Sequence, residues 1–172
     1  MRRPKIINYP DMKVIMRKDF YDVFDNQLKK AVEDAGATFF AHVLIKNYRQ
    51  KDHKVSTFCN HEDWHEIYWE QYYNEDPLEK TIHQAAQKNN FGVISWEITK
   101  NSSPCRKEWT KFTQAKDGIT FSFKRPENHI ESLWVGWRDL HSEQLDTDYL
   151  FHLASLLKPL RDHHWTVHDK VI

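Results

Sequence analysis

The sequence contains little cysteine, carries no net charge and has no long apolar run. Two cysteines, Cys59 and Cys105, are too few for a disulfide scaffold in 172 residues, so they predict reduced thiols in a cytoplasmic protein. The lack of about 20 consecutive apolar residues excludes a transmembrane helix, and the basic N-terminus is not followed by the apolar core of a signal peptide. Basic and acidic residues balance at 25 each, which predicts that this chain does not bind nucleic acid directly.

Glycine is also scarce, whereas aromatic residues are abundant. The chain has four glycines but seven tryptophans, and phenylalanine, tryptophan and tyrosine together make up 14% of it. This aromatic content excludes intrinsic disorder, and the length fits one hydrophobic core. The sequence therefore predicts a single domain over residues 1–172, with an extended N-terminal arm at 1–17 and a frayed tail at 165–172.

Hydrophobic periodicity predicts a mixture of helices and strands. Helices are predicted at 19–35, with Gly36 as its C-cap, and at 60–76, 77–88, 104–116 and 142–164. Strands are predicted at 38–45, 55–59, 91–96, 119–123 and 132–137. Together they predict an α+β fold, an α-β-α sandwich with a five-stranded antiparallel sheet, layered as in PAS and GAF sensor domains.

The segment from Asn60 to Pro77 carries the densest pattern. Four residues recur at helical spacing and share one face of a predicted short helix: Trp64, Ile67, Tyr68 and Tyr72. Asn60 is predicted to cap this helix. Asp76 and Pro77 are predicted to start the next one, because Asp suits the N-cap and Pro the first helical position. Indole and phenol groups on one face suit a pocket for an amphiphilic small molecule.

One interpretation of this segment is metal chemistry. His61, Glu62 and His65 match the H-E-x-x-H pattern, in which two histidines bind zinc and the glutamate acts as a base. The short motif arises often by chance, and Asp63 and Glu66 fill positions that are uncharged in most zinc-protease helices. No third histidine follows at the spacing of the extended motif. A zinc-dependent hydrolase is therefore one alternative, and a solvated charged helix face is another.

A second interpretation is a resemblance to a known family. Several features occur in a fixed order: Trp64, Tyr68, the Asp76-Pro77 pair, Trp96 and Gly118. In this order they resemble the autoinducer-binding domain of LuxR-type quorum-sensing regulators, over roughly residues 15–165. The resemblance implies a sensor of an acyl-homoserine lactone-like signal, with no catalytic residue, metal or cofactor. In the family a helix-turn-helix domain follows, so we expect a stand-alone sensor, an inhibitory partner or a fragment of a longer regulator.

The resemblance also implies roles for individual residues. The indole N–H of Trp64 would donate to the lactone carbonyl, and the Asp76 carboxylate would accept from the ligand amide. Tyr68 would line the wall beside the head group, with Tyr72 on the same helix face. Trp96 and Trp109 would form the wall further along the ligand.

These residues also have purely structural interpretations, which do not require a ligand. Trp64, Tyr68 and Trp96 also suit a hydrophobic core, Asp76 suits an N-cap alone, and Gly118 suits a turn that needs positive φ. The chain departs from the family in the segment 124–129, which lacks glycine, and the register of Ser132 and Val135 toward a ligand is open. A further alternative is a protein-interaction module whose pocket is filled by its own aromatic residues. Expected protein partners are a second copy of the chain or a full-length regulator.

Overall fold

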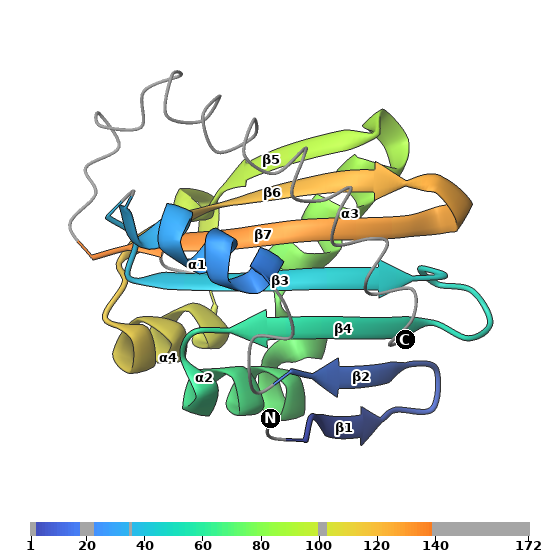
Figure 1. Ribbon diagram of the computed structural model, residues 1–172, viewed down its shortest axis with the longest axis horizontal. Coiled ribbons are helices and arrows are strands. Elements are labelled where there is room, and N and C mark those ends of the chain that lie inside the picture. Colours follow the sequence, from blue (N-terminus) through green and yellow to red (C-terminus); the bar gives the residue numbers. More distant parts are fainter. Residues whose placement is uncertain (1–2, 18–22, 35, 100–102, 139–172) are drawn as a thin grey trace.

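The computed structural model describes residues 3–17, 23–34, 36–99 and 103–138. The strands are β1 (Lys5–Asn8), β2 (Lys13–Met16), β3 (Phe39–Lys46), β4 (Lys54–Cys59), β5 (Phe91–Ser95), β6 (Asp117–Arg125) and β7 (His129–Trp137). The helices are α1 (Val23–Asp34), α2 (Glu62–Ile67), α3 (Pro77–Asn89) and α4 (Pro104–Thr113). These strands form one sheet in the order β1-β2-β4-β3-β7-β6-β5 (Figure 1).

The sheet differs from the predicted one. Seven strands are described instead of five, and β2 pairs with β4 in parallel, so the prediction of a five-stranded antiparallel sheet is wrong. The two additional strands come from residues that were predicted to form an extended arm. They form a hairpin in which Tyr9 N–H donates to the carbonyl of Met12. The hairpin adds to the free edge of β4, where Val14 lies beside Val55.

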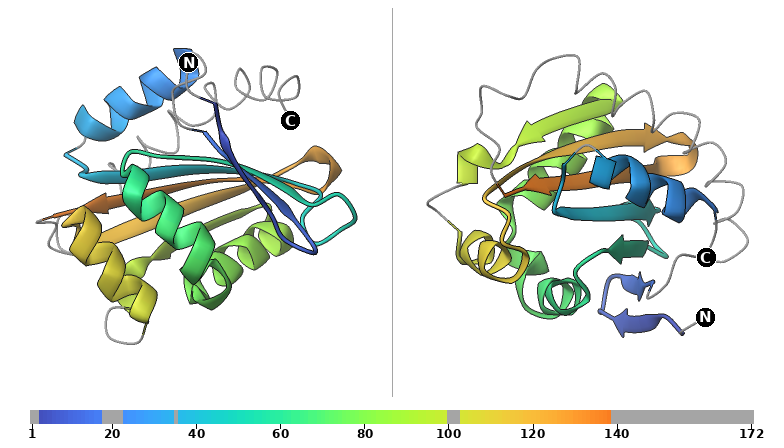
Figure 2. Two further views of the ribbon diagram at one scale, coloured as in Figure 1. Left: turned by 90° about the horizontal axis from the view of Figure 1, so that it is seen from below. Right: turned by 60° about the vertical axis from the view of Figure 1, so that its left-hand side comes forward.

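Helices cover the two faces of the sheet unequally. Figure 2 shows α2, α3 and α4 on one face and α1 on the other. The first face buries a cluster that includes Phe39, Val43, Ile45, Leu78 and Ile82 together with Trp64, Trp69, Trp96, Trp109 and Trp134. The α1 face buries a smaller cluster that includes Val32, Phe40, Phe58, Phe121, Leu133 and Trp137. The predicted α+β layering is therefore confirmed, and the predicted helix 142–164 lies outside the described residues.

The turns confirm one predicted helix end, at Gly36, and show how the segment 124–129 reverses the chain without a glycine. Gly36 has φ of +82°, and its N–H donates to the carbonyl of Glu33 at 2.9 Å, as expected for a helix C-cap. The segment 124–129, which lacks glycine, turns between β6 and β7 through Glu127 and Asn128, which have φ of 62° and 59°. Asparagine tolerates this left-handed region better than most residues, whereas glutamate pays a steric penalty there.

The predicted helix from Asn60 to Asp76 is shorter and changes its winding. The N-cap position belongs to His61, while the side chain of Asn60 accepts from Phe40 N–H at 2.9 Å, so the predicted Asn60 cap is wrong. After Ile67 the chain forms a π-helical turn, Tyr68–Tyr72, and then a 3₁₀ turn. A π turn has more residues than an α turn, so side chains after Ile67 depart from the α-helical period.

Among the described residues, no helix has both the length and the apolar character needed to cross a membrane.

Candidate functional site

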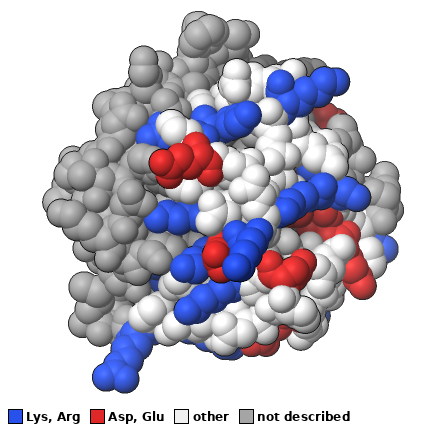
Figure 3. Space-filling model, turned by 90° about the vertical axis from the view of Figure 1, so that its right-hand side faces the viewer, with Lys and Arg blue, Asp and Glu red and all other residues white. Residues whose placement is uncertain are grey.

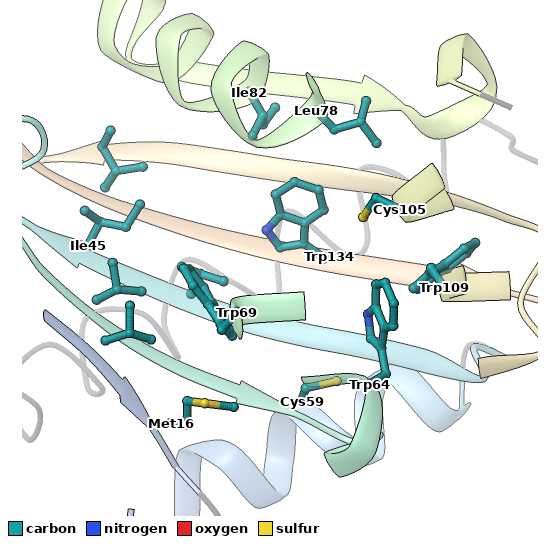
Figure 4. Packing of buried hydrophobic residues seen from close by; sticks show 14 of the residues in the cluster. Met16, Ile45, Cys59, Trp64, Trp69, Leu78, Ile82, Cys105, Trp109 and Trp134 are labelled. Atoms are coloured by element: carbon teal, nitrogen blue, oxygen red, sulfur yellow. The ribbon is translucent and has the colours of Figure 1, made fainter. Parts of the chain in front are cut away.

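A cavity lies between the sheet and the helices α2, α3 and α4. Its volume, taken as the space open to the centre of a water-sized sphere, is about 70 Å³. One buried water needs roughly 10–15 Å³ on the same measure, so the cavity has room for several heavy atoms. Five tryptophans take part in its lining: Trp64, Trp69, Trp96, Trp109 and Trp134. Four of them, labelled in Figure 4, come from α2, the π-helical turn after it, α4 and β7, and Trp96 begins the 3₁₀ turn that follows β5.

Five of the six predicted site residues meet at this cavity. Its lining includes Trp64, Tyr68, Asp76, Trp96 and Trp109. Tyr72 is not a lining residue. Its ring stacks on Trp64, with the ring centroids 5.9 Å apart and an angle of 26° between the planes. Tyr72 therefore contacts the site through Trp64.

Asp76 is held by two hydrogen bonds. Its Oδ1 accepts from the N–H of Leu78 at 2.9 Å, which caps α3, and its Oδ2 accepts from the hydroxyl of Tyr68 at 2.8 Å. Burial raises the pKa of the Asp76 carboxyl above its ordinary value, although the hydrogen bond from Tyr68 acts in the opposite direction. Burial, together with the charge of Asp76, raises the pKa of Tyr68 well above its ordinary value, so Tyr68 stays a donor at neutral pH.

Trp96 and Trp109 pack against two glycines of the sheet, Gly118 and Gly136, which together are called the glycine floor below. Gly118 of β6 and Gly136 of β7 lie opposite each other in the sheet. A Cβ atom at Gly118 would lie 2.7 Å from the Trp96 ring, and one at Gly136 would lie 2.7 Å from the Trp109 ring. The two indoles then meet edge to face, with centroids 4.5 Å apart. Gly118 therefore serves close packing, not the positive-φ turn considered from the sequence.

The indole N–H groups of the lining tryptophans differ in their partners. Trp96 Nε1 donates to Thr120 Oγ1 at 2.7 Å, and Trp134 Nε1 donates to Ser132 Oγ at 3.1 Å. Trp109 Nε1 is buried and has no hydrogen-bond partner among the described residues. Trp96 and Trp134 are thus tied to the sheet, whereas the donor of Trp109 is unused.

Several lining residues were missed by the sequence analysis. Trp69 lies beyond the point where the α-helical period holds, and Trp134 is one of many apolar residues in a strand buried on both faces. His83, Arg106 and His65 are buried polar residues in the lining. Histidine and arginine are mostly exposed in proteins, so no periodic pattern could have placed them there.

The structure shows which face of the sheet Ser132 and Val135 of β7 occupy, a question that the sequence left open. Ser132 is on the cavity face of the sheet, where its hydroxyl contacts Trp134 and lies 3.5 Å from His83 Nε2. Val135 belongs to the cluster on the α1 face.

The two histidines of the H-E-x-x-H pattern have separate hydrogen-bond partners. His61 Nε2 lies 2.8 Å from the carbonyl oxygen of Thr38, and His65 Nε2 lies 3.1 Å from the hydroxyl of Thr57. The described part of the chain contains no group of three or more potential ligands arranged for a metal ion. Both imidazoles thus have structural roles in this fold.

Both cysteines are buried free thiols that line the cavity. Burial raises the pKa of Cys59 to about 12 and raises that of Cys105 as well. They are therefore protonated at neutral pH and contribute apolar surface.

A second, more polar hollow adjoins the cavity. Its volume is about 560 Å³, and Asp76, Pro77 and Glu79 line both spaces. Tyr48, His53 and Tyr73 contribute to the outer hollow. The start of α3 therefore separates the apolar cavity from a polar surface depression.

Comparison with known proteins identifies the fold. No protein-family model and no curated protein matches the sequence. The N-acylhomoserine lactone dependent LuxR-family transcription factor CepR2 from Burkholderia cenocepacia matches with a TM-score of 0.55 and 15% identity, over 78% of this chain and 76% of that chain.

Two structures of Escherichia coli SdiA also match. The complex with octanoyl-rac-glycerol gives a TM-score of 0.62 at 12% identity, over 84% of this chain and 58% of that chain. The solution structure of SdiA 1–171 gives 0.61 at 12% identity, over 80% of each chain. The match thus spans less than two thirds of the longer SdiA chain. The chain has the fold of the autoinducer-binding domain of LuxR-type regulators, as the resemblance in its sequence predicted.

Proposed function

We propose that this chain is a sensing domain that binds an acyl-homoserine lactone-like small molecule in the cavity beneath α2, α3 and α4. One observation carries the proposal: a half-buried carboxylate and a buried indole, Asp76 and Trp64, line a largely apolar cavity. An amphiphilic ligand with one amide and one carbonyl complements such a site.

Asp76 can serve as cap and as ligand acceptor at the same time. Each of its oxygens accepts one hydrogen bond within the protein. A carboxylate has about four lone-pair sites, so it can also accept from a ligand amide. Tyr68 orients the carboxylate through its hydroxyl and leaves its ring as part of the wall.

Trp64 supplies the complementary donor. Its side chain is 4% exposed, and Tyr68, Tyr72 and Phe112 pack around its ring. We infer that its N–H donates to the ligand carbonyl, while Trp96 and Trp109 contact the acyl chain. Phe112 is 38% exposed, so it and Tyr72 are the neighbours of Trp64 that can shift outward to admit a ligand.

The assembly state and effector of this chain are also proposals. CepR2 is a transcription factor and depends on a lactone, which supports a regulatory role without catalysis for this chain. We infer that the domain works as a dimer or together with a full-length regulator. The polar hollow next to Asp76 offers the head group a route from solvent.

Thermal denaturation with a panel of acyl-homoserine lactones tests the proposal. At about 100 times Kd, one lactone should stabilise the fold by roughly 2.7 kcal/mol, which is visible as a higher Tm. Trp64→Phe and Asp76→Asn should each weaken binding by about 1–3 kcal/mol, because a buried ligand group loses its partner.

Two matched variants control for damage to the fold. Trp137→Phe also deletes an indole N–H, but on the α1 face, and Asp63→Asn neutralises an exposed acid of α2. Both should leave ligand affinity unchanged. If no lactone raises the Tm, or if all four variants bind like the parent, the proposed function is wrong and the likeness concerns the fold alone.

A further inference from the structure

Three lysines lie side by side on neighbouring strands of the sheet. Lys13 of β2 pairs with Lys54 of β4, and Lys54 also pairs with Lys46 of β3. Adjacent strands lie about 4.8 Å apart, so these lysines follow one another across the sheet at about this spacing. Lys13, Lys54 and Lys46 are called the lysine row below.

The strand register also gives the direction of the three side chains. Val14, Val55 and Ile45 belong to the cluster on the cavity face of the sheet. Side chains alternate between the two faces along a strand, so the lysine next to each of these residues points to the α1 face. All three lysines are partly exposed. The lysine row therefore lies on one face, at the end of the sheet where β2 and β4 begin.

The surroundings of the lysine row are basic as well. Three turns meet at this end of the sheet, at residues 10–13, 46–54 and 124–129, and the N–H of Tyr48 joins two of them by donating to the carbonyl of Asn128. These segments contain seven lysines and arginines and three acidic residues. Figure 3 views the molecule from this side and shows basic residues spread down its described surface. This end of the molecule thus has a local excess of positive charge, although the whole chain has none.

Lys54 is the most unfavourably placed charge of the row. It has a lysine directly beside it on each neighbouring strand, and like charges in such cross-strand pairs destabilise a sheet. Neither Lys13 nor Lys54 forms an ion pair with a residue that the structure describes, whereas Lys46 has a further interaction within the chain. An anionic partner would relieve the repulsion between Lys13 and Lys54.

The spacing of the row indicates the shape of such a partner. Residues three or four apart on a helix have Cβ atoms about 5–6 Å apart, which is close to the strand spacing. In an extended peptide, residues on the same face are about 6.7 Å apart, so their carboxylates fall out of step with the lysines. A flat lipid surface would match a broad patch better than a single row, and the balanced charge of the chain disfavours duplex DNA.

We propose that the lysine row is a docking site for an acidic helix of a partner protein. The helix lies across β2, β4 and β3 and places carboxylates at positions i, i+4 and i+7 against the three lysines. The cavity is on the opposite face of the sheet, so this docking site goes beyond the proposed function and is independent of what the cavity binds.

NMR titration of the complete chain with three stapled, alanine-rich helical peptides tests the proposal. The first peptide has glutamates at i, i+4 and i+7, the second has the same composition with its glutamates distributed around the helix, and the third has glutamine instead. The first should bind about fivefold tighter than the second or more, and the third should not bind. The backbone amides of Lys13, Lys46 and Lys54 should shift most. Binding should be lost near 1 M salt, where the Debye length is about 3 Å.

Variants of the row should remove this preference. The double variant Lys13→Gln with Lys54→Gln should bind the first two peptides equally weakly. Lys107→Gln with Lys111→Gln removes the same charge from two exposed lysines of α4 and is the matched control, which should keep the preference.

A measurement without any peptide tests the repulsion itself. Lys54→Gln alone should raise the urea midpoint of the chain at low salt, because it removes a charge with a lysine on each side. The gain should disappear at high salt. A lower midpoint for Lys54→Gln would show that Lys54 is stabilised within the chain and would contradict the docking site.

The other outcomes also decide between partners. Equal affinity for the first two peptides, or a preference that persists in the double variant of the row, refutes the docking site. Salt-sensitive binding of duplex DNA at the same amides would assign the row to nucleic acid and refute the acidic helix. If the chain self-associates in analytical ultracentrifugation and the double variant does not, the row binds a second copy and an outside partner is refuted.

Discussion

Asp76 combines a structural and a proposed binding role in one side chain. Asparagine caps helices about as well as aspartate, so Asp76→Asn preserves the start of α3 while removing the charge. The side chain is half-buried, and the loss of solvent around its carboxyl raises the pKa above the ordinary value of 3.8. The protonated form is therefore favoured by folding, and ionisation at higher pH costs stability.

The sign of this coupling predicts a pH dependence for Asp76→Asn. With a raised folded-state pKa, the contribution of Asp76 to stability is complete below the unfolded pKa and is lost as the pH rises through the folded pKa. The free energy of unfolding of the variant, relative to the parent, should therefore increase as the pH rises above 3.8 and level off once the carboxyl is ionised in the folded state. Urea denaturation at a series of pH values measures it. Two parallel pH profiles would show that Asp76 is not perturbed.

The glycine floor predicts a second effect at the residue scale. Gly118→Ala places a Cβ 2.6 Å from the carbonyl oxygen of Val135 and 2.7 Å from the Trp96 ring. Because neither the strand nor the indole can yield cheaply, the variant should lose about 1–3 kcal/mol of stability and weaken ligand binding. Chemical denaturation and calorimetry measure the two effects.

Gly36→Ala is the matched control for this prediction. A Cβ at Gly36 meets nothing within 4 Å, but its φ of +82° strains any other residue. This variant should lose stability through the backbone and leave ligand affinity unchanged. Equal effects of both alanines on affinity would contradict the role of Gly118 in seating Trp96.

At the scale of helices and strands, the sequence correctly predicted the boundaries that depend on a few neighbouring residues. Asp76 and Pro77 mark the start of α3, and Gly36 marks the end of α1, because capping preferences act within a few residues. The hairpin of β1 and β2 was not predicted, because β2 gains its place by parallel pairing with a strand beyond α1 and β3. Trp69 was missed because the π turn breaks the α-helical period.

A partly buried hydroxyl links the hairpin to the π turn. The hydroxyl of Tyr9, between β1 and β2, donates to the carbonyl of Trp69. A π turn alters the backbone hydrogen-bond ladder, so an outside donor can satisfy a carbonyl there. Tyr9→Phe should therefore lower the free energy of unfolding by about 0.5–1.5 kcal/mol, as measured by urea denaturation.

Lys5 provides the contrast for Tyr9. Its ammonium also links β1 to this region through Glu66 and Glu70, but all three side chains are at least 36% exposed. Exposed ion pairs contribute little, so Lys5→Ala should change stability by no more than about 0.5 kcal/mol. A larger loss from Lys5→Ala than from Tyr9→Phe would contradict this ranking of the two contacts.

At the scale of the whole molecule, charge is balanced and distributed. Figure 3 shows basic residues with acidic residues among them over the described part of one face. Basic and acidic residues number 25 each, so the chain lacks the sustained positive field that holds phosphates. This chain should therefore show no salt-sensitive binding to duplex DNA in fluorescence anisotropy titrations. Tight binding that weakens steeply with salt would overturn the prediction.

The distribution of tryptophan has a spectroscopic consequence. Of seven tryptophans in the chain, five surround the cavity, and Trp137 lies on the opposite face of the sheet. Intrinsic emission of the folded domain therefore comes largely from the residues that a bound molecule would contact. A ligand that displaces water from these indoles should shift the emission to shorter wavelength without any attached dye. The abundance of tryptophan around the cavity thus allows ligand binding to be followed by the intrinsic fluorescence of the domain.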